Sequence, residues 1–112
     1  MKQVLLLFLV SMFVQQLLAQ FNGIYVSDAG NFEDPPYQIM KYDLDGGSPE
    51  VFIADNVDWP QDILFLMDAN IVLISNASDG LINRHDATTG TYLSNFASVG
   101  GMPTRMKIGA DG

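Results

Sequence analysis

Residues 39–43 read Ile-Met-Lys-Tyr-Asp, and residues 82–86 read Ile-Asn-Arg-His-Asp, 43 positions further along the chain. The same offset carries Gly47 onto Gly90, so that an Asp-x-x-x-Gly pattern recurs in register. Self-similarity at one spacing in separate places is the signature of a protein built from stacked structural repeats. The sequence therefore predicts a repeat architecture.

The repeat extends to both sides of this stretch. Residues 60–63 (Pro-Gln-Asp-Ile) match residues 103–106 (Pro-Thr-Arg-Met) at the same offset, and residues 25–28 match residues 73–76 at an offset of 48. A period in the low forties with four short strands has the size of one β-propeller blade. A β-sandwich is the alternative all-β architecture, although it does not require strands and turns to recur in register.

The pattern along the chain is that of short strands. Apolar or alternating runs are separated by clusters of Gly, Asp, Asn and Pro, and no convincing amphipathic helix follows residue 20. We expect eight strands, at Ile24–Ser27, Gln38–Asp43, Glu50–Ile53, Ile63–Met67, Ile71–Ser75, Leu81–Asp86, Tyr92–Phe96 and Arg105–Ile108.

These residues carry a family resemblance. The stretch from Pro60 to Phe96 resembles one NHL-type blade, and the turn at residues 86–90 (Asp-Ala-Thr-Thr-Gly) is similar to the D-x-x-T-G turn that is frequent in these propellers. The wider group includes gluconolactonase-like and quinoprotein-like six- and seven-bladed propellers. The sequence departs from the usual pattern at Asp62 and Arg105, where NHL blades have glycine.

The resemblance covers residues 23–112 and implies an all-β fold of antiparallel four-stranded blades. A first blade at about 23–54 would lack its innermost strand, a complete blade would follow at about 60–97, and a third would begin at about 103–112. Propellers have at least four blades, so about two blades predict a fragment of a longer protein. The alternative is a small protein that oligomerises into a ring. Its open sheet edges predict self-association when it is expressed alone.

The first 19 residues have the pattern of a signal peptide. Lys2 precedes an apolar run at residues 4–14, and Leu17-Leu18-Ala19 offers a cleavage site. The run is shorter than the roughly 20 residues that span a bilayer. We therefore expect an exported protein, secreted or periplasmic, with no membrane span.

The charge of the remaining chain excludes some classes of binding partner. Cleavage after Ala19 leaves 4 basic and 13 acidic residues and a net charge of −9. Such a chain repels nucleic acid and anionic membrane surfaces. The absence of cysteine excludes disulfides, so burial and strand pairing must stabilise the fold.

Asp62 and Arg105 form the first candidate site. Both would stand at the entry of an innermost strand in adjacent blades, where side chains face the channel mouth that propellers use for ligands. An acid beside an arginine can orient a polar substrate or a carboxylate. The alternative is a salt bridge that holds neighbouring blades together.

Asp28 and Asn76 form the second candidate site, at the ends of second strands. Carboxylate and amide oxygens are suitable Ca²⁺ ligands, which makes calcium a candidate cofactor. The alternative is turn formation, because Asp and Asn side chains bond to nearby backbone. Asn76-Ala77-Ser78 is also an N-glycosylation sequon, which matters if the source is eukaryotic.

The sequence contains no clear catalytic motif. His85 is its one histidine, and we expect a structural role for it because its repeat partner is Tyr42. The leading interpretation is an exported binding or scaffold module that engages a protein, a glycan or a small molecule. The alternative that the resemblance implies is a calcium-dependent, lactonase-like hydrolase, and a quinoprotein-type oxidoreductase is a third reading.

Overall fold

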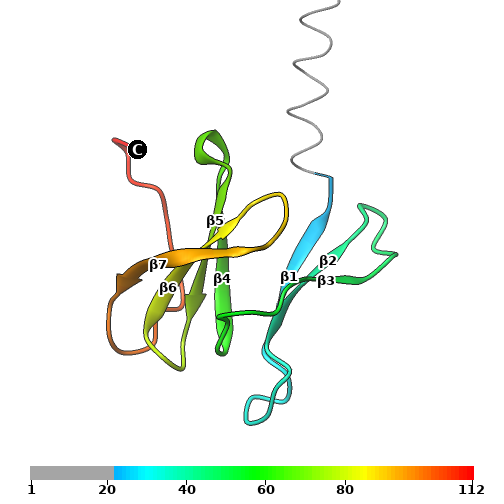
Figure 1. Ribbon diagram of the computed structural model, residues 1–112, viewed down its shortest axis with the longest axis horizontal. Helices are drawn as coiled ribbons and strands as arrows, with labels where there is room; N and C mark the ends of the chain where they lie inside the picture. The colour runs from blue at the N-terminus through cyan, green and yellow to red at the C-terminus, as the bar shows by residue number, and fades with distance from the viewer. Residues whose placement is uncertain (1–21) are drawn as a thin grey trace, which may run out of the picture.

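The computed structural model describes residues 22–112, so the predicted signal peptide at residues 1–19 lies outside the described part of the chain. Seven strands and one short 3₁₀ helix make up the fold, which confirms the predicted all-β class (Figure 1). Their bounds are β1 (Ile24–Asp28), β2 (Gln38–Tyr42), β3 (Glu50–Ile53), β4 (Pro60–Leu66), η1 (Met67–Ala69), β5 (Ile71–Asn76), β6 (Leu81–Asp86) and β7 (Tyr92–Ser98). No helix in residues 22–112 has the length and apolarity needed to cross a membrane.

The strands form two antiparallel sheets. β1, β2 and β3 lie side by side in chain order, and β4, β5, β6 and β7 do the same in the second sheet. Figure 1 shows the three-stranded sheet on one side of β4–β7 and the C-terminal segment on the other side. Each sheet is therefore a simple meander, joined to the other by residues 54–59.

Turn chemistry closes the hairpins. After β6, Asp86 Oδ1 accepts hydrogen bonds from the backbone N–H groups of Thr88 and Thr89, both at 2.8 Å. Gly90 follows with a φ of +76°, a left-handed conformation that glycine adopts without steric cost. The β2–β3 hairpin closes one residue earlier: Gly46, with a φ of +86°, donates its N–H to Asp43 O at 2.8 Å, and Asp43 N–H donates to Gly47 O at 2.8 Å.

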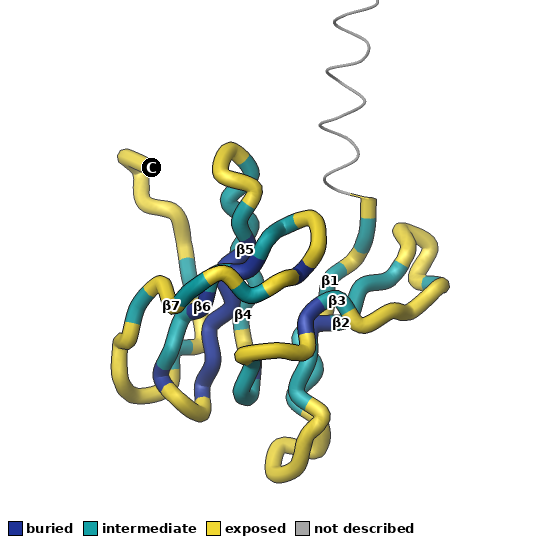
Figure 2. Tube along the Cα trace, in the orientation of Figure 1, coloured by how far each residue is buried: buried dark blue, intermediate teal, exposed yellow. Residues whose placement is uncertain are grey.

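The core lies where the two sheets face each other. Ile39 and Ile53 of the three-stranded sheet and Val72 and Ile74 of the four-stranded sheet are each at most 2% exposed. Tyr25 of β1 also crosses this interface, with its ring 4.9 Å from that of Phe65. In Figure 2 the buried residues gather between the sheets and in β5 and β6. Neither sheet has this core without the other.

Seven of the eight predicted strands are present, most within two residues of their expected bounds. β4 begins earlier than predicted, at Pro60, because Pro60 pairs with Asn76 before a bulge that precedes Ile63. The eighth prediction, at Arg105–Ile108, is wrong. This segment belongs to no sheet within residues 22–112, because a strand requires a neighbouring strand to supply its hydrogen bonds.

Candidate functional site

Asp62 holds the C-terminal segment against β4. Its Oδ2 accepts a hydrogen bond of 2.7 Å from the backbone N–H of Met106, and its Oδ1 accepts one of 3.0 Å from the N–H of Ile63. Its own N–H donates to Ser75 Oγ at 3.0 Å. The structure thus brings positions 62 and 105 together through the backbone next to Arg105, whose side chain is exposed.

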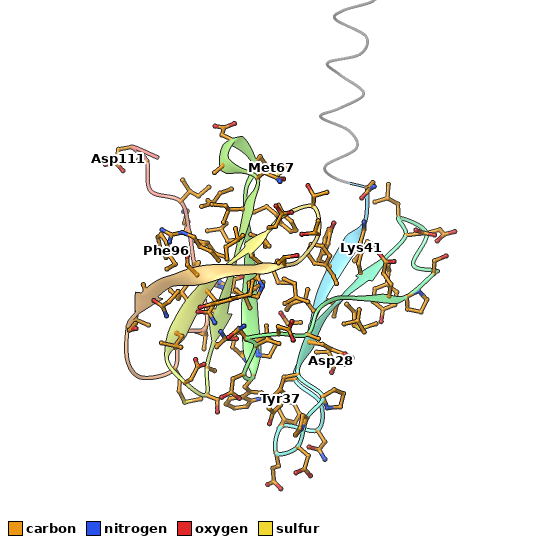
Figure 3. The ribbon with its side chains drawn as sticks, in the orientation of Figure 1. Asp28, Tyr37, Lys41, Met67, Phe96 and Asp111 are labelled. Carbon is orange, nitrogen blue, oxygen red and sulfur yellow. The ribbon has the colours of Figure 1, made fainter. Side chains whose placement is uncertain are left out.

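Asp28 is engaged in its own loop. Its Oδ1 accepts a hydrogen bond from Gly30 N–H at 2.9 Å, and its Oδ2 accepts one from Gln38 Nε2 at 3.1 Å. These bonds close the loop between β1 and β2, which is the turn-forming role that the sequence offered as the alternative. Figure 3 shows Asp28 at the base of that loop.

Asn76 is entirely buried and fastens the linker between the sheets. Its Oδ1 accepts a hydrogen bond of 3.0 Å from Asp58 N–H, and its Nδ2 donates one of 3.5 Å to Asn56 O. The nitrogen that would carry a glycan at the predicted sequon is buried and hydrogen-bonded to the linker, and glycosylation stays a prediction from the sequence. Asn76 and Asp28 share no hydrogen-bond partner among residues 22–112: Asn76 bonds to the linker and Asp28 to its own loop.

No group of three or more His, Asp or Glu side chains in residues 22–112 is arranged to hold a metal ion. The described residues therefore contain no observation that favours the calcium-dependent hydrolase. Calcium binding stays a prediction from the sequence.

His85 is a buried residue of the sheet interface. A carbonyl oxygen can only accept, so His85 Nδ1 carries the proton and donates to Gly90 O at 3.2 Å. Nε2 is buried with no hydrogen-bond partner among the described residues, and burial lowers the pKa of the ring. The neutral imidazole is thereby favoured, and the side chain sits edge-on to Tyr92 with 5.6 Å between ring centroids.

A cavity of about 200 Å³ opens at one end of the sheet interface. Among residues 22–112, its one basic side chain is that of Lys41, which Figure 3 labels. The Lys41 Nζ lies 5.8 Å from the centre of the Tyr25 ring. The cavity is lined by Asn22, Tyr25, Lys41, Phe65, Met67, Asn70, Ala87 and Thr88. Among residues 22–112, the lining contains no Asp, Glu or His side chain, so the described residues supply no acid–base pair there.

A larger hollow of about 400 Å³ lies on the opposite face of β4–β7, between that sheet and the C-terminal segment. We call it the apolar groove. Phe96 lies on this side in Figure 3, 47% exposed. The groove is lined by Leu64, Leu66, Leu73, Ile82, Phe96, Met106, Lys107, Ile108, Gly109 and Gly112.

Strand register builds the groove. Leu64 lies directly opposite Leu73, and Leu73 lies opposite Arg84, so these side chains share one face. The Arg84 guanidinium covers the Phe96 ring at 4.7 Å from its centre and donates to Ser94 Oγ at 3.1 Å. The result is an apolar floor with one fixed cation along its rim.

The sequence reasoning did not name the groove residues as a site. The signal that identifies them is the absence of polar alternation at residues 63–67 and 71–74, where successive side chains are apolar although they point to opposite faces. A strand that is apolar on both faces is typical of a sheet covered on both sides. One side is covered by β1–β3, and the other side is the groove.

The chain matches no family model, no curated protein and no solved structure.

Proposed function

We propose that this chain is an exported segment of a β-propeller of the NHL type and serves as a binding module, with the apolar groove as its contact surface. The binding role is carried by one observation, the groove of about 400 Å³ with its floor of leucine, isoleucine and phenylalanine side chains. Sheets with both faces apolar need a partner on each face. Among residues 22–112, the groove face is the less covered of the two.

The propeller part of the proposal is supported by the internal repeat. Residues 39–43 lie in and just after β2, and their repeat partners at 82–86 form β6, the strand in the corresponding position of the second sheet. Both sheets are meanders, and they stack face to face. Stacked meanders of this size are the building units of propellers.

The energetics favour a partner that contributes apolar surface. Phe96 and Ile108 are 47% and 49% exposed. Full burial of a large apolar side chain stabilises by about 1.5–3 kcal/mol. Covering the groove would therefore stabilise the complex through the burial of several apolar side chains, while the net negative charge of the chain as a whole disfavours nucleic acid.

A fluorescent apolar dye tests whether the groove binds. We expect 8-anilinonaphthalene-1-sulfonate to gain fluorescence with the dilute folded chain, and Phe96→Glu to lower that gain at least fivefold. The glutamate places a charge in the groove floor, where Arg84 can pair with it without disturbing the strand. Circular dichroism would verify that the variant keeps its sheet content.

Leu44→Glu is the matched control. Leu44 is 68% exposed in the β2–β3 turn, so the same change of an apolar side chain to a carboxylate occurs far from the groove. We expect dye binding to be unchanged in this variant. Equal dye fluorescence in the original chain and in Phe96→Glu would contradict the proposed function.

A further inference from the structure

The two sheets present corresponding faces. At the repeat offsets, Tyr25 corresponds to Leu73, Ile39 to Ile82 and Lys41 to Arg84. Tyr25 and Ile39 belong to the face of β1–β3 that is covered by the four-stranded sheet. Leu73, Ile82 and Arg84 share the groove face of β4–β7. The groove is therefore the repeat equivalent of a face that this structure already shows covered by another sheet.

The chain also carries the face that would cover it. In the existing interface, Val72 and Ile74 of β5 supply the covering side chains, and their repeat equivalents in β1 are Ile24 and Val26. Because strand side chains alternate, these two point away from the core. Ile24 and Val26 are 43% and 42% exposed, and Val51, which shares their face through Met40, is 52% exposed.

The backbone of β1 and that of residues 105–108 each have hydrogen-bonding groups that no strand pairs with among residues 22–112. Among residues 22–112, β1 pairs only with β2, so its other edge is open. Residues 105–108 are the repeat equivalent of the part of β4 that pairs with β5, and the Met106 N–H bond to Asp62 holds them along the groove. The segment is thus placed as an innermost strand that lacks its neighbour.

Within residues 22–112 of one molecule, β1 and the C-terminal segment do not pair. Figure 1 shows β1 and the C-terminal segment on opposite sides of the four-stranded sheet. A second copy can reach the segment from the open side of the groove.

We propose that a second copy of this chain docks its β1–β3 sheet on the apolar groove, with its β1 pairing antiparallel to residues 105–108 of the first copy. The inference rests on the proposed binding role of the groove. Transferring the β4–β5 register gives the pairs Met106 with Val26, Lys107 with Tyr25, and Ile108 with Ile24 of the second copy. The two surfaces differ, so the association is head-to-tail and builds rings or open chains.

Disulfide trapping tests the register directly, because the chain contains no cysteine. We expect Met106→Cys mixed with Val26→Cys to give a covalent dimer under mild oxidation. Directly opposed residues of antiparallel strands have Cα atoms about 4.5–5.5 Å apart, within the range of a disulfide. The control mixture is Met106→Cys with Val51→Cys, which lies two strands, about 10 Å, from β1. Equal yields of dimer in the two mixtures would overturn the proposed register.

Sedimentation equilibrium tests the two faces separately. We expect the average mass of the original chain to at least double with rising concentration, and both Phe96→Glu and Val26→Glu to remain monomeric alone. An equimolar mixture of the two variants should form dimers and nothing larger, because each retains one intact face. Leu44→Glu should associate like the original chain.

The outcomes separate this inference from the proposed function. A chain that binds the dye in its groove but stays monomeric at all concentrations would overturn the head-to-tail association and leave the binding role standing. A groove that does not bind the dye removes the proposed function itself. Association that survives both glutamate variants would show that other surfaces are responsible, and would also overturn the inference.

Discussion

The two sheets carry the same pattern but differ in what covers them. Ile39 in β2 is completely buried, whereas its repeat partner Ile82 in β6 is only partly buried. Phe52 in β3 is half-buried, and Phe96 in β7, which lies one residue out of the repeat register from it, is 47% exposed. The side chains are alike, so the difference comes from the neighbour. In a repeat protein, a side chain is buried because a neighbouring unit packs on it, and not because of its own unit alone.

This comparison defines the cooperative unit of the fold. Every fully buried aliphatic side chain of β1–β3 owes its burial to the four-stranded sheet. The apolar face of β1–β3 is buried only against the neighbouring sheet, as in repeat proteins whose units are stabilised by stacking on one another. The two sheets should therefore unfold together, and changes at their interface should have the largest effects.

The largest expected effect is at Gly90, where the second sheet touches the first. A Cβ at this position would collide with the carbonyl oxygen of Phe52, and the φ of +76° already disfavours any other residue. Left-handed backbone costs about 1–2 kcal/mol, and forced overpacking about 1–3 kcal/mol. We expect Gly90→Ala to lower the free energy of unfolding by about 2–5 kcal/mol in urea titrations.

Gly46→Ala separates the two causes. Gly46 has a φ of +86° in the β2–β3 turn, but a Cβ there would meet nothing within 4 Å. We expect a loss of only about 1 kcal/mol, from the backbone conformation alone. Equal losses for the two alanine variants would mean that the contact with Phe52 has no energetic weight.

The next effect sharpens the comparison of the repeat partners. Ile39→Ala removes a fully buried side chain and should cost about 3 kcal/mol, because the cavity cannot close. Ile82→Ala faces the groove and should cost about 1 kcal/mol in a dilute sample. Thermal unfolding followed by circular dichroism would measure both.

A dependence on concentration extends this test. Docking of a second copy buries the groove, so the cost of Ile82→Ala should grow as the protein concentration rises, while that of Ile39→Ala stays constant. If the loss of unfolding free energy caused by Ile82→Ala did not change with protein concentration, the groove would have no second copy bound in it.

Local pattern was sufficient to predict most of the fold. The strands at residues 38–42 and 81–86 follow from short apolar runs bounded by Asp and Gly, whose turns are closed by hydrogen bonds over a few residues. The prediction of a strand at residues 105–108 was wrong, because strand pairing depends on a neighbouring strand and not on the residues of the segment itself. Local propensity cannot supply that partner.

The candidate site was harder to predict for a similar reason. Asn76 has the residue type of a calcium ligand and lies in the sequon of a glycan acceptor. Its side chain, however, is hydrogen-bonded to the backbone of the linker at Asn56 and Asp58. The sequence predicted Asp62 beside position 105 as a ligand-binding residue, but its carboxylate accepts a hydrogen bond from the backbone N–H of Met106. Which polar groups are already satisfied is a property of tertiary contacts, and residue type alone does not reveal it.

The smallest expected effect is on how stability depends on pH. It concerns two adjacent residues, His85 inside the sheet interface and Asp86 in the following turn. Burial lowers the pKa of His85 from 6.5, against weaker opposing influences from the bond to Gly90 and from Asp55. The unfolded chain then binds more protons below pH 6.5, so stability should fall as the pH drops from there. His85→Gln should abolish this first decline, as followed by urea unfolding at pH 7.5, 6.5 and 5.5.

Asp86 should act in a separate, more acidic window. The N–H groups of Thr89 and Thr88 lower the pKa of its carboxyl from 3.8, so its contribution is present above pH 3.8 and disappears as the pH falls through the folded-state value. Asp86→Asn should cost about 1 kcal/mol at pH 7 and flatten only this acid limb. Loss of both declines in His85→Gln would contradict the separation, because it would place the whole acid sensitivity of the fold at the sheet interface.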